Sequence, residues 1–359
     1  MKEKSFKAIH NISLVCLSVG IGLVLCEVIV RTVKPRLYRT DKLLGWSLKP
    51  NLSLRKNITS FKGRDYEAHF ETDSRGFRAT SYKDKRGAQS TRGYKTIFIT
   101  GDSFTANHTT SNNDSWFGVL SKELDIASKV YSYAISGSGT TQQMLAFKRY
   151  KDIIKPDILI IQFCTNDPWN DSINYSKYSI VRNQDWRRPY LKDGNIVYNS
   201  ETKHKLYRLL HSHSRLFQMG DYILQVLQNR SIGGYHDLSN LKPRLKQELK
   251  DESLEYWSKV YKKYIILAKT AGVNDIWSIS CRSRKEKPKI TDYWTKLSNE
   301  LGVIPLESPA DNVYNAESEG LDVRSSDGAH WSDIGHKIVG ESVAKEMNEH
   351  RSRTMNMSH

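Results

Sequence analysis

The pattern of apolar and polar residues singles out one long apolar run near the N-terminus. Residues 12–30 read ISLVCLSVGIGLVLCEVIV and contain a single charged side chain, Glu27. A helix of this length spans about 30 Å, the thickness of the hydrocarbon core of a bilayer. The run is long for a cleaved signal peptide, and no small-residue cleavage site follows it. The pattern therefore predicts one uncleaved membrane helix, which lies within residues 1–36.

The next region, residues 37–93, has no helical period of any length. Its segment 66–72, YEAHFET, alternates between apolar and polar side chains as a half-buried strand does. Gly76 and Gly87 lie in turn-rich surroundings. We expect a short β-rich arm between the membrane helix and the main domain.

From residue 94 onward, predicted strands and helices alternate. The strands are short apolar runs, at 96–100, 130–134, 158–163, 275–279 and 303–306. The helices are expected at 116–126, 141–154 and 332–347. This alternation predicts a parallel sheet with helices on both faces. The rhythm fails between about 168 and 250, which we interpret as an insertion over the carboxyl end of the sheet, with an amphipathic segment at 216–226.

Charge and cysteine content narrow the choice of partners. The chain has 55 Lys and Arg against 39 Asp and Glu, a net charge of +16. The excess is dispersed and accompanies no zinc-finger spacing, basic zipper or RNA-binding signature, so nucleic acid is not an expected partner. A membrane surface or an acidic polymer fits dispersed positive charge. Cys16 and Cys26 lie in the apolar run, and Cys164 with Cys281 are too few for a disulfide scaffold.

The strand at 96–100 ends in Gly101-Asp102-Ser103 and not in an ordinary turn. Open α/β folds bind ligands at the carboxyl ends of their parallel strands, so a serine at this position can face a crevice. A serine hydroxyl is a weak nucleophile and needs a base within hydrogen-bond reach. Asp and Ser are also common helix caps, which is the simpler interpretation of the same residues.

The motif DGAHWSDIGH, residues 327–336, supplies a base and its partner just before the last predicted helix. Asp327 and His330 are three residues apart. An imidazole can take the serine proton, and a carboxylate can fix its tautomer and stabilise its charged form. By itself the pair also fits a helix cap or surface side chains.

Two further motifs follow strand ends and carry hydrogen-bond donors. Residues 134–143 read AISGSGTTQQ, in which Gly137 or Gly139 can bring a backbone amide close to a ligand, and we prefer Gly137. Residues 160–170 read IIQFCTNDPWN, in which the side-chain amide of Asn166 can donate to a developing oxyanion. A plain turn and an Asn-Asp helix cap explain the same residues.

Together the four motifs resemble those of the SGNH family, also called GDSL-type esterases and lipases. The resemblance covers the chain from residue 94 to the last helix and implies a flavodoxin-like α/β/α sandwich with a central parallel sheet. It implies that Ser103 is the nucleophile, with Asp327 and His330 as the other triad members. It also implies an oxyanion hole made by Ser103, Gly137 and Asn166. Members hydrolyse or transfer ester-linked acyl groups without a metal or organic cofactor, so none is expected here.

Three positions depart from the family pattern. Phe104 replaces the usual Leu, Ala134 stands where an Asn often occurs, and Thr165 stands where a Gly usually precedes Asn-Asp. A β-branched Thr165 would tilt Asn166 away from the oxyanion. The arm adds a weaker resemblance, because LLGWSLKPN (43–51) and TDSRGFRA (72–79) are similar to segments of membrane-anchored bacterial members.

We therefore expect four regions. They are an N-terminal membrane anchor at 1–36, a β-rich arm at 37–93, an SGNH hydrolase domain at 94–350 with an insertion at about 168–250, and a disordered tail at 351–359. Basic residues flank both ends of the anchor and leave its orientation open, although long domains cross membranes largely regardless of local charge. We expect the catalytic domain outside the cytoplasmic membrane.

The expected function is that of a serine esterase that removes short acyl groups, acetyl above all, from a saccharide or lipid. Two alternatives are an O-acyltransferase that acts on a surface polysaccharide and a membrane-tethered binding protein with a decayed site. Four aromatic side chains near the expected crevice fit either stacking on sugar rings or packing in the core. They are Trp116, Trp169, Tyr175 and Trp186.

Overall fold

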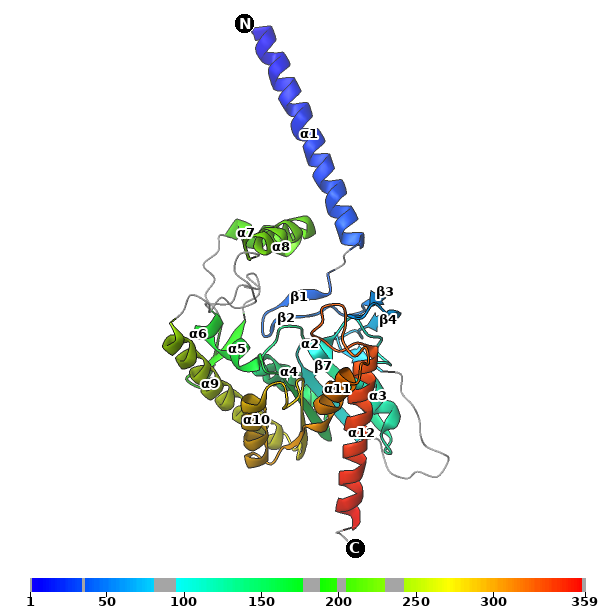
Figure 1. Ribbon diagram of the computed structural model, residues 1–359. Coiled ribbons are helices and arrows are strands. Elements are labelled where there is room, and N and C mark those ends of the chain that lie inside the picture. The colour runs from blue at the N-terminus through cyan, green and yellow to red at the C-terminus, as the bar shows by residue number, and fades with distance from the viewer. Residues whose placement is uncertain are drawn as a thin grey trace.

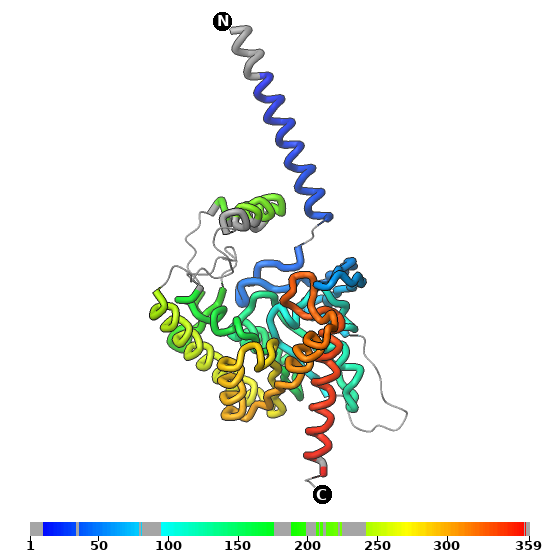
Figure 2. Tube along the Cα trace, in the orientation of Figure 1, coloured from blue at the N-terminus to red at the C-terminus, as the bar shows by residue number. Residues whose placement is uncertain are grey.

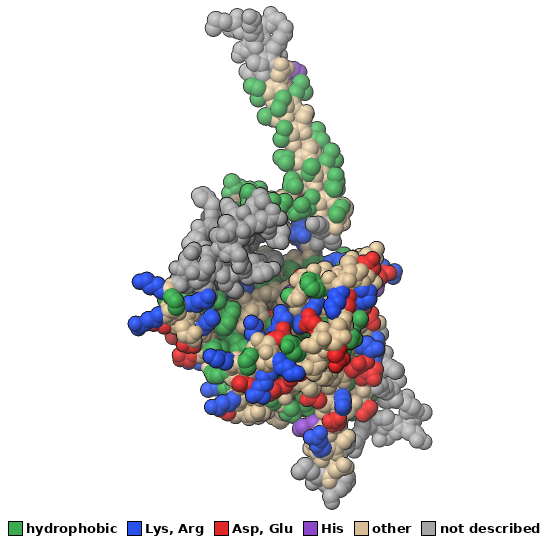
Figure 3. Space-filling view, viewed as in Figure 1, with side chains coloured by type: hydrophobic (Ala, Val, Ile, Leu, Met, Phe, Trp, Pro, Cys, Tyr) green, Lys and Arg blue, Asp and Glu red, His purple; other side chains and the backbone are tan. Residues whose placement is uncertain are grey.

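The computed structural model describes residues 2–33, 36–80, 95–176, 188–198, 205–229 and 242–356. The helix α1 (Lys2–Val33) projects away from the folded part of the chain (Figure 1). Within the described ranges it is the one helix long and apolar enough to cross a membrane, over His10–Val33, and none of that span is buried. Figure 3 shows a largely apolar α1 above a domain whose visible face mixes positive and negative side chains.

The central sheet has six strands in the order β12-β11-β8-β6-β7-β5. The bounds are β5 (Arg78–Ala79), β6 (Lys95–Gly101), β7 (Ser128–Ala134), β8 (Ile158–Phe163), β11 (Asp275–Ser280) and β12 (Ile304–Leu306). Five of them run parallel, and β5 pairs antiparallel with β7. The predicted parallel sheet is confirmed, as is the flavodoxin-like strand order, because β7-β6-β8-β11-β12 follows the 2-1-3-4-5 pattern.

Both faces of the sheet are covered, as the continuous apolar strands require. One face packs under α4 (Thr140–Ile154), α9 (Pro243–Thr270) and α10 (Pro288–Glu300). The other packs under α3 (Trp116–Glu123), α11 (Ser308–Ser318) and α12 (Asp333–Asn356). Alternation along β8 sends Leu159 and Ile161 into the first core and Ile158 and Ile160 into the second. The fold is therefore an α/β/α sandwich.

The arm forms two antiparallel hairpins. Their strands are β1 (Tyr38–Asp41), β2 (Gly45–Leu48), β3 (Ser53–Thr59) and β4 (Asp65–Glu71). The strand predicted at 66–72 is β4, displaced by one residue.

The C-terminal end corrects one expectation. A disordered tail from residue 351 is wrong for residues 351–356, since α12 continues to Asn356. Contacts hold this end of the helix: the ring of His350 packs 5.1 Å from that of Trp277, and Arg353 pairs with Glu349 at 3.3 Å. Residues 357–359 lie outside the described ranges.

The described residues of the region predicted to be an insertion form several helices and a small hairpin. They are α5 (Asp167–Asp171), α6 (Ile173–Ser176), β9 (Pro189–Lys192), β10 (Asn195–Tyr198), α7 (Lys205–His213) and α8 (Arg215–Asn229). The amphipathic segment predicted at 216–226 lies in α8. The trace in Figure 2 brings α8, drawn in green, beside the blue α1, which is far from it in sequence.

Candidate active site

The end of β6 carries the serine predicted to be the nucleophile. The chain leaves β6 at Gly101 and enters the short helix α2 (Ser103–Ala106), whose N-cap Asp102 accepts a hydrogen bond from the Phe104 amide at 3.0 Å. A Cβ atom on Gly101 would lie 2.6 Å from Oε1 of Gln162 on β8. A side chain at position 101 would therefore crowd the side chains of Gln162 and Thr105, and the turn that follows places Ser103 at the carboxyl edge of the sheet.

The strand order reverses beside this turn. The chain moves from β6 outward to β7 on one side and then returns to β8 on the other side of β6. In doubly wound sheets a crevice opens at such a reversal. Ser103 follows β6 and Asn166 follows β8, so both stand at that point.

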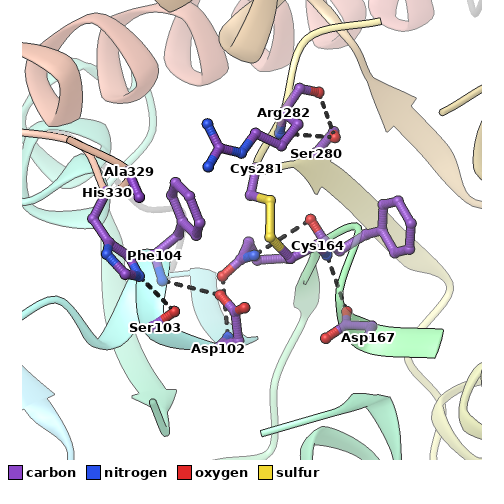
Figure 4. Close-up of a disulfide and its surroundings, with 12 residues drawn as sticks. Asp102, Ser103, Phe104, Cys164, Asp167, Ser280, Cys281, Arg282, Ala329 and His330 are labelled. Carbon is purple, nitrogen blue, oxygen red and sulfur yellow. Dashed lines mark hydrogen bonds between the residues drawn. A yellow bond between two sulfur atoms is a disulfide. The ribbon is translucent and has the colours of Figure 1, made fainter. Parts of the chain in front are cut away.

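The three predicted triad residues lie together. His330 Nε2 is 2.8 Å from Ser103 Oγ, and His330 Nδ1 is 2.5 Å from Asp327 Oδ2. Figure 4 shows His330 and Ser103 facing each other across the end of β6. A proton on Nδ1 shared with the carboxylate leaves Nε2 as the acceptor for the serine hydroxyl, which is the tautomer a general base needs.

Asp327 is held as an anion. Its Oδ1 accepts hydrogen bonds from the backbone amides of Ala329 at 2.9 Å and His330 at 3.0 Å. Burial acts to raise the pKa of Asp327, but the hydrogen bonds from the side chain and backbone of His330 outweigh it and hold the pKa well below its usual value. The carboxylate thus keeps its charge beside the imidazole.

The second histidine of the motif, His336, is buried away from the nucleophile. Its Nδ1 accepts from the Trp116 amide at 3.2 Å, and its Nε2 lies 2.9 Å from Asn107 Nδ2. Burial lowers its pKa far below the usual value, so the ring is neutral. Asn107 also donates to the Trp331 carbonyl at 2.8 Å, and this network holds the loop that carries His330.

The loop after β7 carries the predicted glycine donor. Gly137 has φ of +72°, which a side chain would disfavour. Its carbonyl oxygen accepts from Arg188 Nη2 at 2.8 Å. The neighbouring Ser136 is held by the arm, since its carbonyl accepts from Trp46 Nε1 at 3.1 Å. The amide of Gly139 already donates to Gln142 at 3.3 Å.

Asn166 begins α5 in an ordinary helical conformation, with φ of −91° and ψ of −10°. Thr165 before it has no positive φ, so the backbone freedom of a glycine is not needed there. Burial raises the pKa of Asp102, and hydrogen bonds from the Phe104 amide and the Asn166 side chain oppose that rise. The Asn166 amide therefore lies beside Asp102, the residue that precedes Ser103.

Three buried carboxyls line the base of the site: Asp102, Asp167 and Asp171. Asp171 accepts from the amides of Thr140 and Thr141 at 3.0 and 2.9 Å and so caps α4. Burial raises the pKa of Asp171 to about 6 and that of Asp167 well above its usual value. Within the described ranges, no three His, Cys, Asp or Glu side chains form a group that fits a metal ion.

A disulfide that the sequence analysis missed joins two strands next to the site. Cys164 follows β8 and Cys281 follows β11, with their Cα atoms 5.0 Å apart. A usable signal existed, because each cysteine directly follows one of two strands that pair in the sheet. Arg282 comes next, and its guanidinium lies 5.3 Å from the ring of Phe104 (Figure 4).

The aromatic residues divide between core and insertion. Trp116 is fully buried in the core, and Tyr175 is buried with Trp169 stacked on it at 5.3 Å. The core interpretation therefore holds for Trp116, and Trp169 and Tyr175 stack on each other. Trp186 lies outside the described residues.

Comparison with known proteins gives a family for this region. Residues 97–185 match the family model described as GDSL-like Lipase/Acylhydrolase. The chain carries a GDSL-like acylhydrolase domain. Its enzyme class is accordingly that of hydrolases acting on ester bonds. The match begins in β6 and includes Ser103, Gly137 and Asn166.

Several solved structures are similar to this chain over about 70% of its length. TesA is 12% identical, with a TM-score of 0.39 over 69% of this chain and 96% of its own. Axe2, an acetylxylan esterase from Geobacillus stearothermophilus, is 12% identical, with a TM-score of 0.39 over 70% of this chain and 93% of its own. The psychrotrophic esterase EstA from Pseudoalteromonas sp. is 9% identical, with a TM-score of 0.39 over 72% and 99%. A comparison with curated protein sequences gave no match.

Proposed function

We propose that the chain is a membrane-anchored serine esterase that cleaves short acyl esters, acetyl above all, on a saccharide or lipid. The observation that carries this proposal is the relay from Ser103 through His330 to Asp327, with separations of 2.8 and 2.5 Å. Such a relay has one well-understood use, the activation of a serine hydroxyl for attack on an acyl carbon.

In the acylation step, Ser103 Oγ attacks the ester carbonyl carbon while its proton moves to His330 Nε2. Negative charge develops on the carbonyl oxygen and is stabilised by the amides of Ser103 and Gly137 and by the side chain of Asn166. That side chain has two N–H donors, so one can serve Asp102 while the other serves the oxyanion. Collapse of the tetrahedral intermediate breaks the ester bond, and His330 returns the proton to the departing alcohol.

In the deacylation step, water takes the place of the alcohol. His330 accepts a proton from the water, whose oxygen attacks the acyl carbon bound to Ser103. The second tetrahedral intermediate collapses to release the carboxylic acid and regenerate the serine hydroxyl. Asp327 stays ionised throughout and stabilises the imidazolium that forms in each step.

A small acyl group fits the crowding around the nucleophile. The ring of Phe104 lies 4.7 Å from that of His330, and the guanidinium of Arg282 lies over the ring of Phe104. We propose that these side chains limit the space beside Ser103. We therefore favour acetyl over longer acyl chains.

Two features outside the triad support the proposed location. The apolar span His10–Val33 is unburied and long enough to cross a bilayer. The Cys164–Cys281 disulfide is of a kind that persists in oxidising compartments. We propose a single-pass anchor with the catalytic domain on the extracytoplasmic side.

A substrate series on the full chain in detergent tests this proposal. We expect hydrolysis of 4-nitrophenyl acetate with kcat/KM falling steadily for the butyrate and octanoate esters. A saccharide acceptor should leave the rate of nitrophenol release unchanged. Acyl transfer to the acceptor would instead favour the O-acyltransferase, and a preference for octanoate would contradict the short-acyl assignment.

A further inference from the structure

Glu27, the single charged residue of the apolar run 12–30, binds the start of α8. Its carboxylate accepts hydrogen bonds from the Arg215 amide at 2.7 Å, the Leu216 amide at 2.8 Å and the Ser214 hydroxyl at 2.9 Å. A carboxylate in this position satisfies the unpaired amides of a helix N-terminus and its partial positive charge. Glu27 therefore fixes α8 to the membrane helix.

A second contact reinforces the first. Arg31, one turn further along α1, pairs with Glu27 at 2.6 Å and also donates to the carbonyl oxygen of His213 at the end of α7. Glu27 is six residues before Val33, or about 9 Å along a helix axis. The α7–α8 hairpin is thus attached to α1 inside the apolar span, near its C-terminal end.

The inner side of this hairpin is held by its own contacts. The hydroxyl of Tyr207 on α7 donates to Asp221 on α8 at 2.7 Å. The ring of Tyr207 also packs edge-on against Phe217, with centroids 5.3 Å apart. The two helices consequently form one unit.

The outer side of the hairpin is apolar and exposed. Leu206, Leu209 and Leu210 of α7 are exposed and follow the i, i+3, i+4 spacing of one helix face, and Ile223 and Leu224 of α8 are exposed as well. Leu209 is 56% exposed and Leu224 is 59% exposed. Figure 3 shows apolar side chains of this hairpin beside the apolar surface of α1.

Basic side chains gather at the same level. Burial, together with the positive charges of Arg215 and Arg31, lowers the pKa of Arg36, and burial with the charges of these three arginines lowers the pKa of Lys49. Four cations from three separate parts of the chain therefore lie near one another beside Glu27. Positive side chains gathered at this level attract the phosphates of phospholipids at a bilayer surface.

We propose that the α7–α8 hairpin is a second membrane-binding element, which lies in the plane of the bilayer interface with its leucines and isoleucine among the lipid acyl chains. The inference rests on the proposed anchor, because continuity with α1 selects a bilayer over a second copy of the chain. An amphipathic helix pair beside positive charge is the form that interfacial binding takes. Lys49 of the cation cluster belongs to the arm, and through Tyr38 and Trp46 the arm contacts Ser136 in the loop of Gly137.

Spin-label accessibility in the full chain tests the hairpin directly. Cys16→Ala and Cys26→Ala remove the two free thiols, and nitroxide is then attached to Leu209→Cys or Leu224→Cys. Ile266→Cys is the matched control, because Ile266 is an apolar residue of α9 that is 63% exposed. The proteins are reconstituted into vesicles of phosphatidylcholine and phosphatidylglycerol.

We expect the labels at positions 209 and 224 to collide with oxygen several-fold more than with a water-soluble nickel complex, and the label at 266 to show the reverse. Water-like accessibility at all three positions would overturn the inference. Shielding of 209 and 224 from both reagents would also overturn it and indicate a protein partner or a second copy. Alkaline carbonate extraction distinguishes failure of the proposed anchor from failure of the hairpin proposal. Loss of the chain from the vesicles rejects the anchor. Retention of the chain, with labels that are as accessible as in water, rejects only the membrane-bound hairpin.

Discussion

Arg188 donates a hydrogen bond from Nη2 to the carbonyl oxygen of Gly137 at 2.8 Å. The same guanidinium donates from Nη1 to Gln142 at 3.1 Å and lies 4.9 Å from the ring of Trp46. The insertion and the arm thus meet on the loop that carries the proposed amide donor. Arg188 is a positioning residue in this account, because it acts through Gly137.

Arg188→Met should lower kcat while KM changes little. Loss of a direct oxyanion donor costs about 10²–10³ in kcat, and loss of its support should cost less, about tenfold. Arg188→Lys restores charge without the fork of donors and should recover only part of the rate. Steady-state kinetics on 4-nitrophenyl acetate measure kcat and KM separately. A rise in KM with unchanged kcat would reject the positioning role.

Asn166→Ala should lower kcat by about 10²–10³ with little change in KM, because the donor acts on charge that develops only in the transition state. Thr165→Gly is the companion variant. Since Thr165 has no positive φ, the glycine should bring no gain in rate. Near-normal kcat in Asn166→Ala would leave the amides of Ser103 and Gly137 as the donors, and a faster Thr165→Gly would mean that the threonine does misplace Asn166.

Removal of the disulfide should reduce both stability and activity. Cys164 and Cys281 are separated by 117 residues, and closing a loop of that size contributes about 5 kcal/mol in the chain-entropy picture. The bond also fixes the chain two residues before Asn166. The double variant Cys164→Ala with Cys281→Ala should therefore unfold at lower urea concentration and turn over more slowly. Cys16→Ala with Cys26→Ala is the control and should behave as the parent protein.

Asp171 should give the unfolding free energy a pH dependence of defined sign. Burial raises its pKa from 3.8 to about 6 in the folded state. A carboxyl whose pKa is higher in the folded state than in the unfolded state stabilises the fold below pH 4. This contribution to the free energy of unfolding is lost as the pH rises through 6. Two pKa units correspond to about 3 kcal/mol. In Asp171→Asn, the free energy of unfolding measured in urea should fall less between pH 4 and pH 6.5, by roughly that amount. A fall as large as in the parent protein would contradict the shifted pKa.

Much of the fold could be predicted because its strands are almost wholly apolar. β8 consists of six buried residues, and a run of that kind has few interpretations other than the centre of a parallel sheet. The helix α9 was missed because its buried face mixes aliphatic, aromatic and small polar residues among many charged ones, so no clean apolar period stands out in the sequence. The end of α12 was missed because His350 packs on Trp277, a contact between residues distant in sequence.

The residues of the candidate site likewise fall into two groups, those in local sequence motifs and those whose partners are distant in sequence. Ser103, Asn166 and His330 each stand in a local motif at a strand end or before a helix, so the sequence indicates them and the sheet brings them together. Arg188 carries no local signal, since its partner Gly137 lies 51 residues away. The pairing of Cys164 with Cys281 likewise depends on which strands are neighbours, which follows from the strand order of the sheet.

The most direct test of the central claim is the covalent fate of Ser103. The full chain is quenched during turnover of 4-nitrophenyl acetate, digested, and examined by mass spectrometry alongside Ser103→Ala. The account predicts an acetyl group on the peptide that contains Ser103, no such adduct in the variant, and a fall in kcat of about 10⁴ or more. An adduct on another residue, or normal turnover by folded Ser103→Ala, would contradict it.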